Sequence, residues 1–242
     1  MSQATVLQSA RSRPGRRFSP THELALAQPA LRATEALPGA SSGLLVMEEM
    51  PAPIGIPDLT ALVGNSADVT ARLSLAIPPL LHEVDAAIVS VAHAERPRSA
   101  AAFAKALGWP ESTVGRRLRQ LVRSGALIEV RPCIFVRPFA LKPLGRIYAV
   151  EAKVDNWTQA VKQARSYALW SDAYVLVLGS LSPKTIERVL VEVGQDRAGL
   201  VVGGKWIRRP AVRKVPNRMR LWASEHFVAA LSVSDYQPSV CP

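Results

Sequence analysis

The chain of 242 residues has few of the side chains that build disulfide frameworks or metal clusters. It contains two cysteines, Cys133 and Cys241, too few for a disulfide framework or a cysteine-rich zinc site. The histidines are scattered and lack ligand spacing: His22, His82, His93 and His226. No apolar run has the length of a membrane span. The sequence therefore predicts a cytoplasmic protein with no membrane partner.

Acidic residues are also scarce. There are 19 acidic against 30 basic residues, which gives a formal net charge of +11. This balance favours a polyanionic partner, either nucleic acid or an acidic membrane, although ribosome-associated and other basic proteins share it. Residues 1–20 are rich in Arg, Ser and Pro, which predicts a disordered basic arm. The arm has no apolar segment of the kind found in secretory signals.

The most informative stretch is residues 146–178, which reads as strand, helix, strand. In the first strand, 147–154, Glu151 and Lys153 are two apart and share one face. Gln163 and Tyr167 are four apart, so they form a row on the helix. The second strand, 173–178, is apolar enough to be buried on both faces. Taken alone, Glu151 and Lys153 have another explanation, a solvated pair on an edge strand, because this spacing occurs often by chance.

A second acidic residue lies within an apolar segment upstream. Residues 43–50 and 54–63 predict two strands of a hairpin, and the second contains Pro57 and Asp58. A buried carboxylate needs a cation or hydrogen-bond donors beside it. Asp58 is therefore either a metal ligand or an acceptor of backbone hydrogen bonds in a turn.

Together these motifs resemble the PD-(D/E)xK nuclease superfamily, and Gln163 with Tyr167 resembles the Q-x-x-x-Y motif of its RecB-type members. The resemblance implies a restriction-endonuclease-like α/β fold, with a mixed β-sheet flanked by helices. It implies that Asp58 and Glu151 hold Mg²⁺ or Mn²⁺, and that Lys153 orients the attacking water. Gln163 and Tyr167 would line the site. In this family a preceding helix often adds an acidic residue; the helix-prone segment 21–37, interrupted at Pro29, offers Glu23 and Glu35.

Between Asp58 and Glu151 the sequence inserts a helical unit at about residues 73–139. A first amphipathic helix runs from Pro79 to Val91. Ser99 is placed to cap a second helix, which ends at Leu107. A third helix opens at residues 111–113 and ends before Gly125. Two short strands follow, 127–131 and 134–137.

This order resembles the winged helix-turn-helix domain of bacterial transcription regulators. The resemblance implies that the third helix enters the major groove of double-stranded DNA. It assigns contacts along this helix to Ser112, Thr113, Arg116, Arg117 and Arg119. Arg98, Arg123, Arg131 and Arg137 would contact phosphates. Use of the same unit for protein contacts is the alternative.

After residue 178, Ser182 and Pro183 predict the start of a helix that runs to Glu192, and residues 198–202 predict a strand. Residues 205–220 carry seven basic residues around Trp206, typical of a nucleic-acid groove or a solvated tail. Residues 221–231 are expected to form a helix that packs back on the core. The predicted domains are a basic arm (1–20), a discontinuous nuclease-like core (21–72 and 141–242) and a winged helix-turn-helix domain (73–140).

Two functions fit these patterns. The first is a metal-dependent DNA nuclease targeted by its internal winged helix, associated with the nucleoid if the host is bacterial. The second is a DNA-binding protein or transcription regulator whose nuclease-like domain is inactive. An RNA-binding basic protein would explain the charge but not the motifs. A homodimer is compatible with either function.

Overall fold

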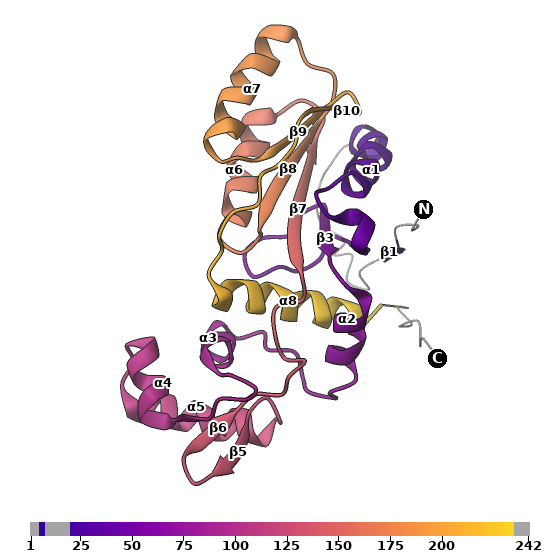
Figure 1. Ribbon diagram of the computed structural model, residues 1–242. Coiled ribbons are helices and arrows are strands. Elements are labelled where there is room, and N and C mark those ends of the chain that lie inside the picture. The colour runs from indigo at the N-terminus through magenta and orange to yellow at the C-terminus, as the bar shows by residue number, and fades with distance from the viewer. Residues whose placement is uncertain (1–4, 8–19, 235–242) are drawn as a thin grey trace.

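The computed structural model describes residues 5–7 and 20–234, with two β-sheets and eight α-helices among them (Figure 1). The main sheet has seven strands in the order β1-β2-β3-β7-β8-β9-β10. Its strands are β1 (Thr5–Leu7), β2 (Leu44–Glu48), β3 (Leu59–Val63), β7 (Arg146–Lys153), β8 (Ala173–Leu178), β9 (Gly199–Val202) and β10 (Lys205–Arg208). The sheet is mixed: β2, β3 and β7 are antiparallel neighbours, whereas β7, β8 and β9 are parallel. The chain is therefore a mixed α/β protein.

Helices cover both faces of the main sheet. They are α1 (Pro20–Glu35), α6 (Trp157–Tyr167), α7 (Pro183–Gln195) and α8 (Asn217–Ser232). Alternate residues of β7 separate the two cores, as the period of a strand requires. Ile147 and Ala149 pack with α6, α7 and α8, whereas Tyr148 and Val150 pack with α1. Because β7 also pairs with a strand on each side, it is an interior strand rather than an edge.

A second unit lies between β3 and β7. It contains α3 (Glu83–Val91), α4 (Ala100–Leu107) and α5 (Glu111–Arg123), with a small sheet of β4 (Arg98–Ser99), β6 (Ile134–Val136) and β5 (Ile128–Arg131). Phe103, Leu118 and Phe135 lie in a core of its own. The short helix α2 (Ser66–Leu73) precedes this unit. The predicted three helices and the two strands after them are present, and β4, between α3 and α4, adds a short third strand to the small sheet.

The long helix α8 lies between the two units (Figure 1). Leu221 belongs to the core of the winged-helix unit, and Phe227 to the core beneath the main sheet. Between them, Glu225 is fully buried and forms an ion pair with Arg72 of α2, with 2.6 Å between Oε2 and Nη2. The same oxygen accepts a hydrogen bond from the backbone N–H of Leu80 at 2.9 Å. A single helix thus ties the sheet to the inserted unit.

The insert leaves and re-enters the sheet at one place. Gly64 follows β3 and Gly145 precedes β7, and a Cβ on Gly64 would lie 3.2 Å from the Cα of Gly145. A Cβ on Gly145, whose φ is +88°, would lie 2.5 Å from the carbonyl oxygen of Val63. Such a close approach of backbones, at a positive φ, requires glycine. We call Gly64 and Gly145 the neck of the insert.

Most of the predicted elements are confirmed, and their ends follow the expected capping chemistry. The side chains of Ser99 and Ser182 accept hydrogen bonds from the N-terminal turns of α4 and α7. Gly125 follows α5 with a φ of 78°. The strand at 173–178 is confirmed residue for residue, and every residue of it is buried. The predicted C-terminal helix is also present, as α8.

Four expectations are wrong. Helix α1 continues through Pro29, because packing of its apolar side against the sheet outweighs one missing backbone hydrogen bond. Helix α3 begins at Glu83 rather than Pro79, because successive prolines disfavour helix and His82 caps the new start. Pro57 and Asp58 precede β3 instead of lying within it.

The fourth concerns the basic arm, where residues 5–7 form β1, parallel to β2. The rest of the segment up to residue 19 lies outside the described residues. Within the described residues, no helix is long and apolar enough to cross a membrane.

Candidate functional site

The register of the main sheet brings Asp58 beside Glu151. Leu59 of β3 pairs with Val150 of β7, so the residue before Leu59 is opposite the residue after Val150. The Oδ2 atom of Asp58 accepts a hydrogen bond of 2.7 Å from the backbone N–H of Ala152. Two carboxylates that are 93 positions apart in the sequence therefore meet at the end of one antiparallel strand pair.

Glu151 and Lys153 form a buried ion pair. Their side chains are 1% and 7% exposed, and Oε1 of Glu151 lies 3.4 Å from Nζ of Lys153. Because β7 is an interior strand, the alternative of a solvated pair at the edge of a sheet is wrong. A buried charged pair is weak evidence for stability, since desolvation opposes the attraction. Its position therefore favours a functional explanation.

Helix α6 contributes the remaining members of the cluster. Tyr167 is buried, and its hydroxyl donates a hydrogen bond of 2.8 Å to Oε2 of Glu151. Gln163 lies one turn earlier on α6, and its Oε1 is buried without a hydrogen-bond partner among the described residues. An orphaned amide oxygen in this position is available to a water or a cation. We call Asp58, Glu151, Lys153, Gln163 and Tyr167 the acidic site.

The surroundings of Glu151 in the acidic site raise the pKa of its carboxyl group. Burial, together with the neighbouring Asp58 carboxylate, raises the pKa of Glu151 to about 7. Lys153 and the hydroxyl of Tyr167 act in the opposite direction but do not cancel the rise. Burial and a like charge together are the pattern of a functional carboxyl pair.

The side chains of the acidic site fit a divalent metal ion. Two neighbouring carboxylates suit Mg²⁺ or Mn²⁺, which prefer oxygen ligands and commonly use one or two carboxylates with waters. Among residues 5–7 and 20–234, no group of three or more His, Cys, Asp and Glu side chains is placed to hold a metal. The sequence offered Glu23 and Glu35 of α1 as a further acidic residue of the site. Glu35 is exposed to solvent, and the side chain of Glu23 lies outside the described part of the chain.

Helix α5 corresponds to the third helix of the predicted winged helix-turn-helix domain and carries most of the residues expected to contact DNA. Its apolar residues Val114, Leu118 and Leu121 are buried against α3 and α4, which turns the opposite side to solvent. That side and the strand β5 carry hydroxyl and guanidinium groups that reach solvent, from Ser112, Thr113, Arg116, Arg119, Arg123 and Arg131. Helix α5 and strand β5 thus both carry arginines that are exposed to solvent.

Two of the expected DNA contacts already have partners within the chain. Arg137 donates hydrogen bonds to the backbone carbonyls of Ala92, Pro138 and Phe139. Burial lowers its pKa. Arg117 lies 3.1 Å from the ring of His82 and 3.7 Å from a carboxylate oxygen of Asp85. These two arginines hold the winged-helix unit together, and we leave them out of the proposed DNA surface.

Residues 80–131 match the family of helix-turn-helix domains. The match runs from the segment before α3 to the end of β5, and so includes the recognition helix. Comparisons with curated proteins and with solved structures gave no match. A helix-turn-helix domain indicates DNA binding, and the exposed arginines of α5 agree with it.

The sequence patterns did not reveal a second charged cluster, at the opposite end of β7. Asp172 is nearly buried just before β8, and it lies beside Arg146, Arg213, Lys214 and Arg220. Arg213, Lys214 and Arg220 belong to the basic segment that the sequence did single out. The rest of the cluster could have been found from Asp172, because it is an acidic residue directly before an apolar strand, as Asp58 is.

Proposed function

We propose that this chain binds double-stranded DNA through its helix-turn-helix domain and hydrolyses phosphodiester bonds at the acidic site. The observation that carries the nuclease proposal is the meeting of Asp58, Glu151, Lys153 and Tyr167 at one point of the sheet. These residues come from three segments and from both sides of the insert. Their meeting supports the resemblance to the PD-(D/E)xK superfamily.

The mixed α/β architecture also supports the proposal. Helices flank both faces of a mixed sheet, as the resemblance to restriction-endonuclease-like proteins implies. The inserted winged helix accounts for the unusual separation of Asp58 from Glu151, because β3 and β7 remain direct neighbours. The distance in sequence is therefore no objection to a shared site.

Asp58 and Glu151 would hold the divalent metal, Mg²⁺ or Mn²⁺. When bound, such an ion lowers the pKa of a coordinated water and offsets negative charge on the phosphate. Tyr167 would keep Glu151 in position through its hydroxyl, and the backbone N–H of Ala152 does the same for Asp58. Each carboxylate is thus oriented by a donor of its own.

The ammonium group of Lys153 would interact with the negative charge of the phosphate. Its ammonium group already lies beside Glu151, so it is placed to orient a water and to stabilise developing charge on a phosphoryl oxygen. The Oε1 atom of Gln163 would accept a hydrogen bond from that water or its neighbour. DNA itself would be held by α5, with Arg116 and Arg119 reaching the major groove or its phosphates.

A second candidate function is DNA binding without cleavage. It is favoured by the near-complete burial of Glu151 and by the lack of a third acidic or histidine ligand in the described part of the chain. A regulator would need the helix-turn-helix domain but no metal.

Cleavage of supercoiled plasmid and linear duplex in Mg²⁺ or Mn²⁺ separates the two functions. Wild type is compared with Lys153→Ala and Asp58→Ala, and Lys184→Ala on α7 is a matched surface control. We expect cutting by wild type and by the control, and its loss in the two site variants. Wild-type protein that shifts DNA in a gel but cuts neither substrate would refute the nuclease and support the binding protein.

The contribution of α5 is tested on the same substrates. The double variant Arg116→Ala with Arg119→Ala should weaken DNA binding while leaving the acidic site intact. Removal of two phosphate contacts would lower the slope of log affinity against log salt by roughly 2. An unchanged slope would remove α5 from the DNA surface.

A further inference from the structure

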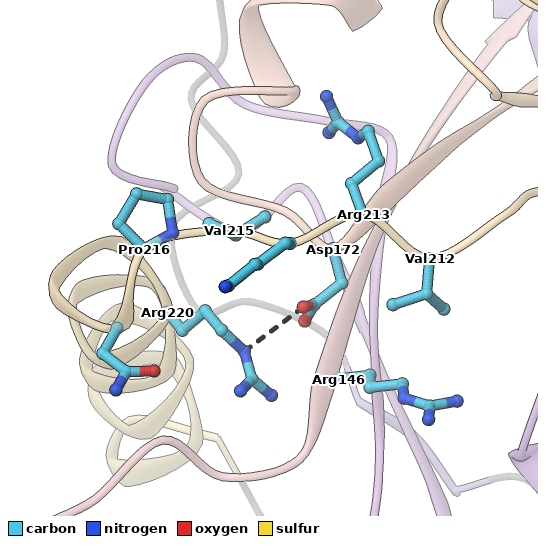
Figure 2. Close-up of a pocket in the computed structure, with 9 residues that line it drawn as sticks. Arg146, Asp172, Val212, Arg213, Val215, Pro216 and Arg220 are labelled. Atoms are coloured by element: carbon cyan, nitrogen blue, oxygen red, sulfur yellow. Dashed lines mark ion pairs between the residues drawn. The ribbon is translucent and has the colours of Figure 1, made fainter.

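A cavity of about 600 Å³ lies between the start of β7 and the N-terminus of α8. It is separate from the acidic site, which is at the other end of β7. Four cationic side chains line it, from Arg146, Arg213, Lys214 and Arg220, against the single carboxylate of Asp172. Figure 2 shows Asp172 between Arg220, which comes from α8, and Arg146, which comes from β7. We call this the basic pocket.

The carboxylate of Asp172 belongs to the wall of the pocket. Its Oδ2 atom accepts a hydrogen bond of 2.8 Å from the backbone N–H of Ile147, and Oδ1 lies 3.2 Å from Nε of Arg220. The backbone N–H of Asp172 donates a hydrogen bond to the carbonyl of Ile147, and its carbonyl accepts one from the backbone N–H of Arg213. Asp172 thus fixes the start of β8 against the start of β7, and its single negative charge leaves the four cations in excess.

Two of the arginines are held in place by backbone carbonyls. Arg220 donates to the carbonyl of Gly145 at 2.5 Å, and Arg213 donates to that of Ser171 at 3.1 Å. Both side chains are therefore preorganised rather than free to turn into solvent. Arg146 and Lys214 are exposed at the mouth. A pocket with fixed cations in its wall and exposed ones at its rim favours a compact, multiply charged anion.

The start of α8 adds positive potential to the same cavity. Pro216 and Asn217 line the pocket, no side chain caps this helix terminus, and its first turn contains no acidic residue. The first turn instead carries basic residues, which the helix dipole disfavours. An anion in the pocket would interact favourably with the helix dipole and would reduce the repulsion between the arginines.

We propose that the basic pocket binds a phosphate group. Fixed guanidinium groups match the oxygens of a phosphate, and the volume admits a nucleotide or a segment of a phosphodiester backbone. The DNA of the proposed function is one source of this phosphate, and a free phosphorylated ligand is the other. The inference rests on the proposed function only for the choice between these sources.

The position of the pocket suits the DNA backbone. Arg146 directly follows the neck through which the winged-helix unit joins the sheet. It is five residues from Glu151 along β7, a span of roughly 17 Å. This is the length of about five base pairs, so one bound duplex could contact the basic pocket and the acidic site together.

Phosphate binding is tested first without DNA. The melting temperature of the full chain is compared in inorganic phosphate and in sodium chloride of equal ionic strength. The double variant Arg146→Ala with Lys214→Ala removes the two exposed cations of the pocket and keeps the arginines that hold backbone carbonyls. Lys184→Ala with Arg188→Ala on α7 removes two exposed cations elsewhere. Phosphate should raise the melting temperature of wild type and of the α7 control, and not that of the pocket variant.

The second arm identifies the source of the phosphate. DNA affinity is measured against salt for the same three proteins. If the DNA backbone occupies the pocket, each phosphate contact that the pocket variant no longer makes lowers the slope of log affinity against log salt by about 1, and the slope of the control stays unchanged. A phosphate effect on melting with no change in slope would assign the pocket to a free phosphorylated ligand.

No phosphate effect on melting, together with equal slopes for the pocket variant and the control, would overturn the proposal. Failure of the proposed function gives a different result. A wild type that does not bind DNA leaves the melting arm intact, and that arm alone then decides whether the pocket binds phosphate.

Discussion

Replacing Glu151 with glutamine should make the metal-free protein increasingly stable relative to the wild type as the pH rises. The pKa of Glu151 rises from 4.5 to about 7 on folding, mainly through burial and then through Asp58. The folded state therefore holds its proton more tightly than the unfolded chain does. The stabilisation from this proton is complete below the unfolded pKa and is lost as pH rises through about 7.

The size of the effect follows from the two pKa values. Linkage gives a loss of about 2–3 kcal/mol in the free energy of unfolding between about pH 5 and pH 8, at about 1.4 kcal/mol for each unit of pKa shift. Glu151→Gln keeps the shape of the side chain and cannot ionise. The difference in unfolding free energy between wild type and variant should therefore change by this amount across the range, in favour of the variant at high pH.

Equilibrium unfolding in urea, at several pH values and with a chelator present, measures this difference. Glu192→Gln is the matched control, because Glu192 is a partly exposed residue of α7 in an ion pair with Arg165. A difference between wild type and Glu151→Gln that stays constant from pH 5 to pH 8 would refute the reasoning, since it would mean that Glu151 ionises as it does in the unfolded chain. Addition of Mg²⁺ at pH 8 should stabilise wild type and leave Glu151→Gln unaffected.

Three further predictions concern stability. Glu225→Ala leaves Arg72 buried without its partner and should lower the free energy of unfolding by about 3–5 kcal/mol; chemical denaturation measures it, and a loss below about 1 kcal/mol would contradict the burial of the pair. Gly145→Ala should destabilise by at least about 1–3 kcal/mol, because the new Cβ meets the carbonyl of Val63 at a positive φ; a melting temperature equal to that of wild type would speak against the tight neck. Tyr167→Phe removes a hydrogen bond that lowers the pKa of Glu151, so the pH midpoint of the stability change should move upwards; a midpoint that moves down would rule out this role of the hydroxyl.

Local patterns in the sequence were sufficient for the elements whose ends depend on their own side chains. Helix α4 begins directly after Ser99, which caps it, and Gly125 follows α5, because both features depend only on neighbouring backbone groups. The alternation along β7 placed Glu151 and Lys153 on one face, since the period of a strand is fixed. The predicted interruption of the helix at Pro29 was wrong, because packing of α1 against the sheet outweighs the backbone hydrogen bond that proline cannot make.

The assembly of the acidic site was only partly visible in the sequence. Motifs pointed to Asp58 and Glu151 separately, but their meeting depends on the pairing of Leu59 with Val150 across the whole insert. Nothing local encodes this register. The basic pocket was harder still, because Arg146, Asp172 and Arg220 come from three separate segments. The position of α8 between the two units was also not predictable from local patterns, because it depends on packing of the helix against both cores.

The neck has a consequence for how the chain folds. Strand β7 cannot pair with β3 until the ends of the insert, at Gly64 and Gly145, come together. Compared with a four-residue turn, closing a flexible loop of this length costs roughly 3 kcal/mol more in chain entropy. A winged-helix unit that folds first brings those ends together and removes most of that cost. The inserted unit would then act as a template for the central strand pair, and the acidic site would form only after the DNA-binding unit has folded.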